Sequence, residues 1–297
     1  MLQHQEIDRP LLPALARAAR GWSGMAELEA RTDAAMAQLR EQRPQAARHS
    51  AALARWQVTL DDRLRTDQPE YLDDPDFPAE RRVAIAQALH RFNRQVFAYT
   101  RFYHALRPTL RRLSAELNPP VRVLELASGS GEFALDLSDR ARRDGLPVEV
   151  TGSDYFAEHV EACRAKAAQR GVATAFREIN AFDMGGLDEG EYDLVFIAQS
   201  LHHFSPGQIA MMIAQSLRVA TTGFVGIDGQ RSLGLYAVVP AMGALMRSTD
   251  FIHDAVISLR KFLTHSELEL IARIAAPEAF VRARGLNPGY SMLEVLR

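Results

Sequence analysis

The stretch VLELASGSGEF, residues 123–133, constrains the fold more than any other part of the sequence. It begins with apolar residues of strand character, continues with the small residues 127–131, and resumes apolar residues at helical spacing from Phe133. In parallel α/β sheets, a strand that turns into a helix through small residues brings backbone N–H groups against a bound cofactor. The stretch therefore predicts a cofactor-binding strand–loop–helix unit.

The sequence pattern differs before and after this unit. Residues before about Pro119 are rich in Ala, Leu, Arg and Glu, which favours helices. The linker DQPEYLDDPDFP, residues 67–78, interrupts them with three prolines, and one further helix is expected from about Ala79 to Leu106. After Pro120, strand and helix patterns alternate, and two strand-like segments end the chain. This order predicts an α/β fold with a doubly wound parallel sheet and an antiparallel C-terminal hairpin at its edge.

Composition excludes several classes of protein. The formal charge of −2 over 297 residues gives no electrostatic reason to expect a nucleic acid partner. A single cysteine, Cys163, excludes an internal disulfide framework and a thiolate metal cluster, and favours a reducing compartment. The first ten residues have no apolar signal-peptide core, and the longest apolar stretch, residues 233–246, is too short to span a membrane. These features predict a cytoplasmic protein without a membrane span.

The glycine-rich turn alone is weak evidence for a particular cofactor, because nicotinamide and flavin folds also use one. The pattern here is an acid within the strand followed by small residues and GSG, without a P-loop lysine. It resembles the first motif of the class I S-adenosylmethionine-dependent methyltransferases, and three further motifs follow in order over roughly residues 118–297: GSDYF, INAFDM and YDLVFIAQSLHHF. The resemblance implies a Rossmann-like sheet of seven strands.

The resemblance also implies which residues bind S-adenosylmethionine. The loop glycines would let the main chain approach the cofactor, Glu125 would accept a hydrogen bond from its ammonium group, and Asp154 would accept both ribose hydroxyls. Ala127 replaces a glycine usual in the family, so the loop should be less permissive there. The predicted cofactor-binding residues are Glu125, Ala127, Ser128, Gly129, Gly131, Asp154, Tyr155, Asn180, Ala181, Phe182 and Gln199.

Methyl transfer to oxygen or carbon also requires a proton acceptor for some substrates, and histidine serves near neutral pH. His202 and His203 resemble the LHH segment of small-molecule methyltransferases, and His253 lies in a segment that resembles a motif of bacterial relatives. For each of them a structural role is the alternative. The predicted catalytic residues are therefore His202, His203 and His253, the predicted substrate contacts are Tyr99, Tyr103, His104 and Asp254, and no residue is assigned to a metal.

These residues predict methylation of an oxygen or carbon atom of a small, largely apolar metabolite, with S-adenosylhomocysteine as the product. A polyketide, a quinone precursor or an aromatic metabolite of small-molecule biosynthesis fits. The Asn/Asp-Pro-Pro-aromatic signature that supports methylation of planar amino groups is absent after the fourth strand. Three alternatives stay open: other chemistry with the same cofactor, such as cyclisation or decarboxylation, a non-catalytic partner protein with this fold, and a nicotinamide oxidoreductase.

Two domains are expected. Residues 1–117 form a helical domain that serves as a lid over the substrate or as a dimerisation module. Residues 118–297 form the cofactor-binding domain, in which residues 229–263 are inserted over the pocket. The helical domain leaves a homodimer as one expected assembly.

Overall fold

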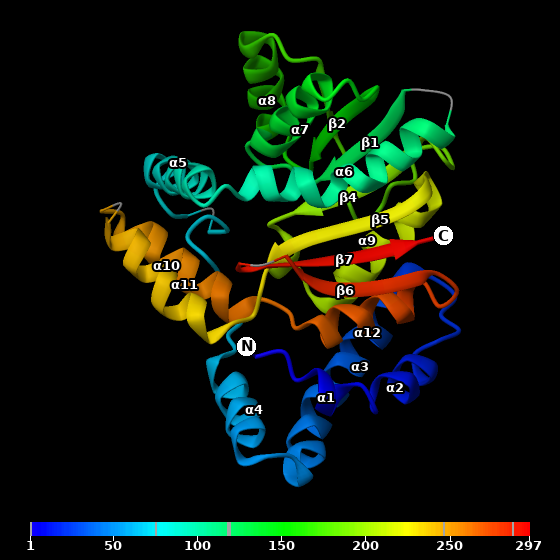
Figure 1. Cartoon of the computed structure of the whole chain (residues 1–297), viewed down its shortest axis with the longest axis vertical. Helices are drawn as coiled ribbons and strands as arrows, with labels where there is room; N and C mark the ends of the chain where they lie inside the picture. The colour runs from blue at the N-terminus through cyan, green and yellow to red at the C-terminus, as the bar shows by residue number, and fades with distance from the viewer. Residues whose placement is uncertain (1, 75, 118–119, 246, 287) are drawn as a thin grey trace.

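One mixed sheet organises the chain (Figure 1). The computed structural model describes residues 2–74, 76–117, 120–245, 247–286 and 288–297. Within them, strands lie in the order β3-β2-β1-β4-β5-β7-β6, with β7 antiparallel to both neighbours and the remaining pairs parallel. The strands are β1 Val121–Leu126, β2 Val148–Asp154, β3 Thr174–Glu178, β4 Tyr192–Ala198, β5 Ala220–Gly229, β6 Phe280–Leu286 and β7 Tyr290–Leu296.

The central strands are buried on both faces. Every residue of β4 from Tyr192 to Ile197 is buried, and all of β1 except Arg122 is buried as well. Parallel strands covered by helices on both sides have continuous apolar runs instead of alternation, and residues 194–198 of β4 form such a run. The predicted fold class, a doubly wound Rossmann-like sheet of seven strands with an antiparallel C-terminal hairpin, is confirmed.

Helices cover both faces of the sheet. The helices on one face pack in a layer against β4 to β7, with N-terminal helices outside them, and those on the other face pack against β1, β2 and β3. The first group is α2 Leu12–Ala18, α3 Met25–Ala46, α9 Pro206–Val219 and α12 His265–Ala275, and the second is α6 Ala98–Glu116, α7 Glu132–Arg143 and α8 Ala157–Arg170.

The N-terminal helices share the core of the sheet. Leu28 and Met36 of α3 belong to the same buried cluster as Ile209 of α9. On the opposite face, Phe102 of α6 packs in one cluster with Phe133 of α7. The helical residues before the sheet thus supply layers on both of its faces, and the expected boundary at residue 118 falls outside the described residues.

The prediction of a single helix from about Ala79 to Leu106 is wrong. The segment forms two helices, α5 Ala79–Gln95 and α6 Ala98–Glu116, separated at Phe97. Phe97 has a φ of 55°, in the left-handed region, and its side chain is 69% exposed. A phenylalanine gives no sequence signal for this conformation, which L-residues with large side chains rarely adopt, so the break could not be read from the pattern.

Further helices gather at the carboxyl ends of the parallel strands (Figure 1). There α11 packs against α10, against α5 and against the short 3-10 helix that follows β4. Among the described residues no helix is long and apolar enough to cross a membrane. The remaining helices are α1 Gln5–Asp8, α4 Ala52–Leu64, α10 Leu233–Leu245 and α11 Thr249–Lys261, with 3-10 helices η1 Ala47–His49 and η2 Leu201–His203.

Candidate active site

The glycine-rich loop between β1 and α7 lies against the end of β2. The Gly129 backbone N–H donates to Asp154 Oδ2 at 2.9 Å, and the Phe156 N–H donates to Asp154 Oδ1 at 3.1 Å. His159 Nδ1 lies 3.3 Å from the same Oδ1. Burial opposes ionisation of Asp154, but these hydrogen bonds outweigh it and hold its pKa below the usual value. An ionised Asp154 therefore fixes the position of the loop.

Glu125 lies buried at the end of β1, directly before this loop. The residue is 3% exposed, and its Oε2 has no hydrogen-bond partner among the described residues. Burial raises the pKa of Glu125 to about 8, against a smaller effect of a hydrogen bond from the Ala134 backbone N–H. A buried, unsatisfied carboxyl oxygen is costly unless a donor reaches it. Glu125 therefore fits the ammonium group of S-adenosylmethionine as a partner.

The two loop glycines have different surroundings. A Cβ on Gly129 (φ +51°) would meet no heavy atom within 4 Å, so this position faces open space. A Cβ on Gly131 (φ +70°) would come within 2.7 Å of Cys163 Sγ and 2.9 Å of the Phe176 ring. Gly129 thus fits the predicted close approach to a cofactor, whereas Gly131 is required by packing against α8 and β3. The sequence alone does not distinguish these two requirements.

Two non-glycine residues at the ends of adjacent strands have left-handed backbones. Ala127 after β1 has a φ of 48°, and Gln199 after β4 has a φ of 61°. Such conformations cost of order 1–3 kcal/mol each and gather at functional sites. Ala127 stands where the resemblance expects glycine, and its positive φ is the conformation that glycine would adopt without strain.

The residues predicted near the adenine lie at the ends of β2 and β3. Tyr155 and Phe156 are 63% and 53% exposed, with their rings in an edge-to-face pair. The Asn180 side-chain oxygen accepts the Phe182 backbone N–H at 2.9 Å, so the predicted adenine acceptor also closes a turn. Ala181, which lies between Asn180 and Phe182 in the chain, is half-buried. Exposed aromatic rings beside an ionised Asp154 form a surface on which a flat heterocycle can stack.

Gln199 is joined to the N-terminal half of the chain. Its side-chain amide exchanges two hydrogen bonds with that of Asn93, which is 2% exposed on α5. Tyr99, at the start of α6, stacks on Phe133 and lines, with Asn93, a cavity of about 510 Å³ between α5, α6 and α7. Sequence reasoning missed Asn93, because a lone buried amide in an amphipathic helix carries no motif.

Tyr103 and His104 lie away from the loop. The Tyr103 hydroxyl donates to Asp144 Oδ2 at 2.7 Å and so attaches α6 to the end of α7. His104 is exposed on the next position of α6. The structure therefore brings Tyr99 toward the candidate site and leaves Tyr103 and His104 outside it.

His202 and His203 form part of η2, directly after β4. His202 is held by Asp228 at the end of β5, which lies 2.9 Å from its Nδ1 and also accepts its backbone N–H at 2.8 Å. His203 Nδ1 lies 3.0 Å from Asp73 Oδ2. Burial opposes protonation of His203, but the hydrogen bond with Asp73 and nearby carboxylates outweigh it and raise its pKa.

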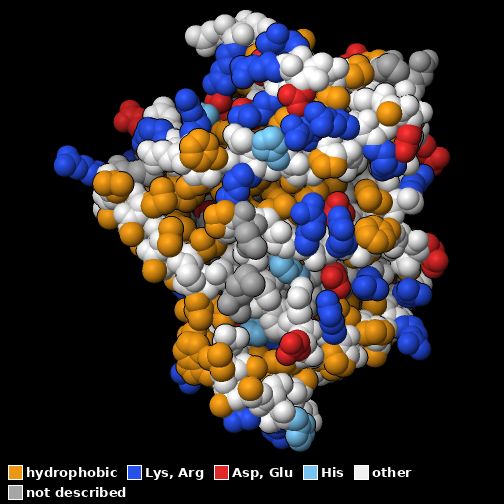
Figure 2. Space-filling view, viewed as in Figure 1, with side chains coloured by type: hydrophobic (Ala, Val, Ile, Leu, Met, Phe, Trp, Pro, Cys, Tyr) orange, Lys and Arg blue, Asp and Glu red, His pale blue; other side chains and the backbone are white. Residues whose placement is uncertain are grey.

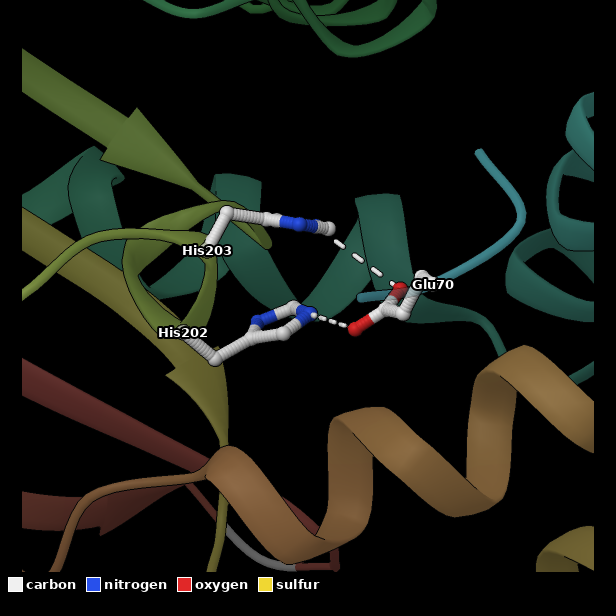
Figure 3. A group of neighbouring side chains, drawn as sticks. All are labelled: Glu70, His202 and His203. Carbon is white, nitrogen blue, oxygen red and sulfur yellow. Dashed lines mark ion pairs between the residues drawn. The ribbon is translucent and has the colours of Figure 1, made fainter. Parts of the chain in front are cut away.

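A buried carboxylate of the 67–78 linker completes this cluster (Figure 3). Glu70 is 3% exposed, and its two oxygens face the two imidazoles: Oε1 lies 3.6 Å from His202 Nε2 and Oε2 lies 4.0 Å from His203 Nε2. Sequence reasoning took residues 67–78 only as a linker and missed Glu70. No local pattern could have revealed it, because the partners are more than 130 positions apart in the chain.

His253 and Asp254 fix the same linker in place. Both Asp254 carboxylate oxygens accept backbone N–H groups, from Tyr71 at 2.8 Å and from Leu72 at 3.1 Å. The His253 ring stacks on Tyr71 with 3.8 Å between ring centroids. These contacts give Asp254 a structural task, and they place His253 on the linker, apart from the histidine pair of η2.

Comparisons with known proteins agree with this geometry. The family model described as "Methyltransferase domain" matches residues 123–223. A demethylmenaquinone methyltransferase of Deinococcus radiodurans is 32% identical over 104 residues, or 35% of this chain and 40% of that protein. A demethylmenaquinone methyltransferase of Thermus thermophilus is 34% identical over 92 residues, 31% of this chain and 40% of that protein. The chain spans about 40% of the length of these curated relatives.

Solved structures show the same fold at low sequence identity. The plantazolicin methyltransferase BpumL in complex with S-adenosylhomocysteine is 14% identical, with a TM-score of 0.54 over 76% of this chain and 92% of that one. The plantazolicin methyltransferase BamL is 14% identical, with a TM-score of 0.53 over 71% of this chain and 90% of that one. The strand order, the loop on Asp154 and the matched region confirm the resemblance. Residues 123–223 therefore match a methyltransferase domain, and the sheet around them has the fold of the class I S-adenosylmethionine-dependent methyltransferases.

Proposed function

We propose that this chain transfers the methyl group of S-adenosylmethionine to an oxygen or carbon atom of a small, largely apolar metabolite. The observation that carries the proposal is the buried carboxyl of Glu125, whose unsatisfied oxygen lies directly before the loop in which Gly129 faces open space. A carboxyl oxygen that can accept a hydrogen bond from an ammonium group and a loop open to a ligand are what this cofactor requires.

The chain's own residues would bind and orient the reactants. When bound, S-adenosylmethionine supplies a methyl group already activated on a sulfonium, so the protein mainly aligns the acceptor and excludes water. Glu125 and Asp154 would hold the two polar ends of the cofactor. The end of β4 at Ala198 and Gln199 lies beside the loop, and the Asn93–Gln199 amide pair holds α5 over it.

An apolar acceptor is supported by the surface around the carboxyl ends of the strands. Figure 2 shows apolar side chains gathered on the side of the molecule formed by α5, α10 and α11. Val238 and Leu245 of α10 are 51% and 82% exposed, although the helix is among the most apolar of the chain. The matched relatives are described as acting on demethylmenaquinone, and the similar structures as plantazolicin methyltransferases. A quinone-like, polyketide or aromatic acceptor is consistent with both.

An O–H or C–H acceptor must also lose a proton. The predicted proton acceptors are still His202, His203 and His253. The first two follow β4, which is the neighbour of β1 in the sheet, and β1 leads into the glycine-rich loop.

The experiment is calorimetric titration followed by product analysis. We expect the full chain to bind S-adenosylhomocysteine and not NADH, and to convert an apolar acceptor to a product heavier by one methyl group. A changed product without an added methyl group, formed without consumption of S-adenosylmethionine, would favour cyclisation or decarboxylation. Cofactor binding without any turnover, together with activation of a partner enzyme, would favour a non-catalytic role.

A further inference from the structure

We propose that Glu70, His202 and His203 form a binding site for a divalent transition-metal ion (Figure 3). The site goes beyond methyl transfer and does not depend on it. One atom able to bind a metal from each of the three side chains lies within 4.8 Å of the other two.

The distances between the Glu70 oxygens and the two histidine Nε2 atoms fit coordination of one shared ion better than direct hydrogen bonds. The Glu70 oxygens lie 3.6 Å and 4.0 Å from the Nε2 atoms of His202 and His203, which is beyond hydrogen-bond range. Ligands at about 2.1 Å from a tetrahedral Zn²⁺ are roughly 3.4 Å apart. Small side-chain rotations would therefore place all three groups at coordination distance.

Each imidazole is oriented as a metal ligand requires. His202 Nδ1 contacts Asp228 and His203 Nδ1 contacts Asp73, at 2.9 and 3.0 Å. A carboxylate on Nδ1 holds the proton on that nitrogen, so the lone pair of Nε2 is directed to the ion, and metal-binding histidines usually have such a partner. Both Nε2 atoms face Glu70 (Figure 3).

The burial of Glu70 with one unpaired oxygen is the independent observation that points to a ligand. Its side chain is 3% exposed, and Oε1 has no hydrogen-bond partner among the described residues. Lys261 Nζ lies 3.6 Å from this oxygen and 3.8 Å from Asp73 Oδ2, so it supplies charge without a hydrogen bond to Oε1. A buried carboxylate with an unsatisfied oxygen costs free energy that a bound cation would recover.

The charges around the site also favour a divalent cation. With neutral imidazoles, the carboxylates of Glu70, Asp73 and Asp228 stand against the single ammonium of Lys261, which leaves a net charge of −2. Two imidazoles and one carboxylate are the ligand set of catalytic zinc sites and of other first-row metals, and not of Ca²⁺ or Mg²⁺, which prefer oxygen. Zn²⁺ and Co²⁺ are therefore the appropriate probes.

The site joins two distant parts of the chain. Glu70 comes from the 67–78 linker, which Asp254 and the stacked His253 and Tyr71 rings hold in place, and the histidines follow β4. An ion here would fix the linker to the end of β4. It would also occupy both Nε2 atoms, so the histidines could not then serve as free proton acceptors. A metal-bound acceptor oxygen or water would lose its proton more readily instead.

The test is metal binding by the full chain after treatment with a chelator. We expect calorimetry with Zn²⁺ at neutral pH to give one site per chain, a rise in Tm on binding, and a Co²⁺ absorption spectrum typical of imidazole and carboxylate ligands. Glu70→Gln and His203→Asn should each weaken binding by on the order of 100-fold, and Asp73→Asn by about 10-fold. Lys261→Met should strengthen binding, because it removes a competing cation.

His49→Gln is the control. This exposed histidine of η1 has no part in holding the linker and is not grouped with Glu70, so its loss should leave Zn²⁺ affinity unchanged. Absence of a Zn²⁺ site in the folded wild-type chain would overturn the proposal, and Lys261 would then be the intended partner of Glu70. Binding that Glu70→Gln does not weaken would overturn it as well. Neither result would alter S-adenosylhomocysteine binding, so the proposed function is tested separately.

Discussion

Asn93 and Gln199 exchange two hydrogen bonds between their side-chain amides, at 2.9 and 3.0 Å, and so join helix α5 to the end of strand β4. Asn93 is buried, and Gln199 adopts a left-handed backbone to reach it. Removing either side chain would leave the amide of the other without its partner, and the amide of Asn93 would then be buried and unpaired.

We predict that Asn93→Ala and Gln199→Ala are not additive. Each single substitution should lower the free energy of unfolding by about 1–3 kcal/mol, because it strands a polar group. The double variant should lose less than the sum, with a coupling of roughly 0.5–3 kcal/mol measured by urea unfolding. Additive losses would show that the pair does not hold α5 in place.

The loop glycines should respond differently to substitution. Asparagine tolerates the left-handed conformation, so Gly129→Asn should leave the protein folded with nearly unchanged Tm while its side chain blocks S-adenosylhomocysteine binding. Gly131→Ala should instead lower stability by about 1–3 kcal/mol, because its Cβ meets Cys163 and Phe176. Calorimetry and thermal melts of both variants check this, and full cofactor affinity in Gly129→Asn would contradict the assignment of the loop.

Glu125 should make stability depend on pH between about 4.5 and about 8. Its pKa is about 8 in the folded chain against an ordinary value of 4.5. Within that window the unfolded chain has lost the Glu125 proton while the folded chain retains it, so rising pH favours unfolding. The free energy of unfolding of the wild type should therefore fall with pH relative to Glu125→Gln, as chemical denaturation at several pH values would measure. Parallel pH profiles would contradict a buried, protonated Glu125.

Glu267 anchors N-terminal helices to α12. It is wholly buried, and Arg65 and Arg43 approach its Oε1 at 2.7 and 3.3 Å. Burial alone would raise its pKa, but the arginine charges hold it well below the usual value. Glu267→Gln keeps a residue able to form the capping box with Thr264 but removes the charge, and should lower the free energy of unfolding by about 3–5 kcal/mol.

Glu269→Gln on the same helix is the control for that prediction. Its contact with Arg273 is 3.7 Å long and lies at the surface, so the loss should be about 0–1 kcal/mol. Because the pKa of Glu267 is lowered, its contribution should be present above pH 4.5 and lost as the pH falls below that value. Equal losses in the two variants would show that the buried arginines do not depend on Glu267.

Local patterns predicted the parts of this structure that depend on neighbouring residues. Ser205 with Gln208 and Thr264 with Glu267 form capping boxes at the spacing typical of a helix start, and Asp154 ends β2 beside the glycine loop as the motif implies. What the sequence could not predict are contacts between distant segments. Glu70 meets the histidines of η2 only through the path of the linker, and Asn93 meets Gln199 across a separation of 106 positions in the chain.

The most direct test of the account is incubation of the full chain with methyl-deuterated S-adenosylmethionine and a panel of hydroquinones, phenols and polyketide-like acceptors, followed by mass spectrometry. We predict that at least one acceptor gains one labelled methyl group, that S-adenosylhomocysteine accumulates in equal amount, and that Gly129→Asn abolishes both. A folded wild-type chain that binds S-adenosylhomocysteine but labels no acceptor in the panel and consumes no S-adenosylmethionine would contradict the proposed methyl transfer.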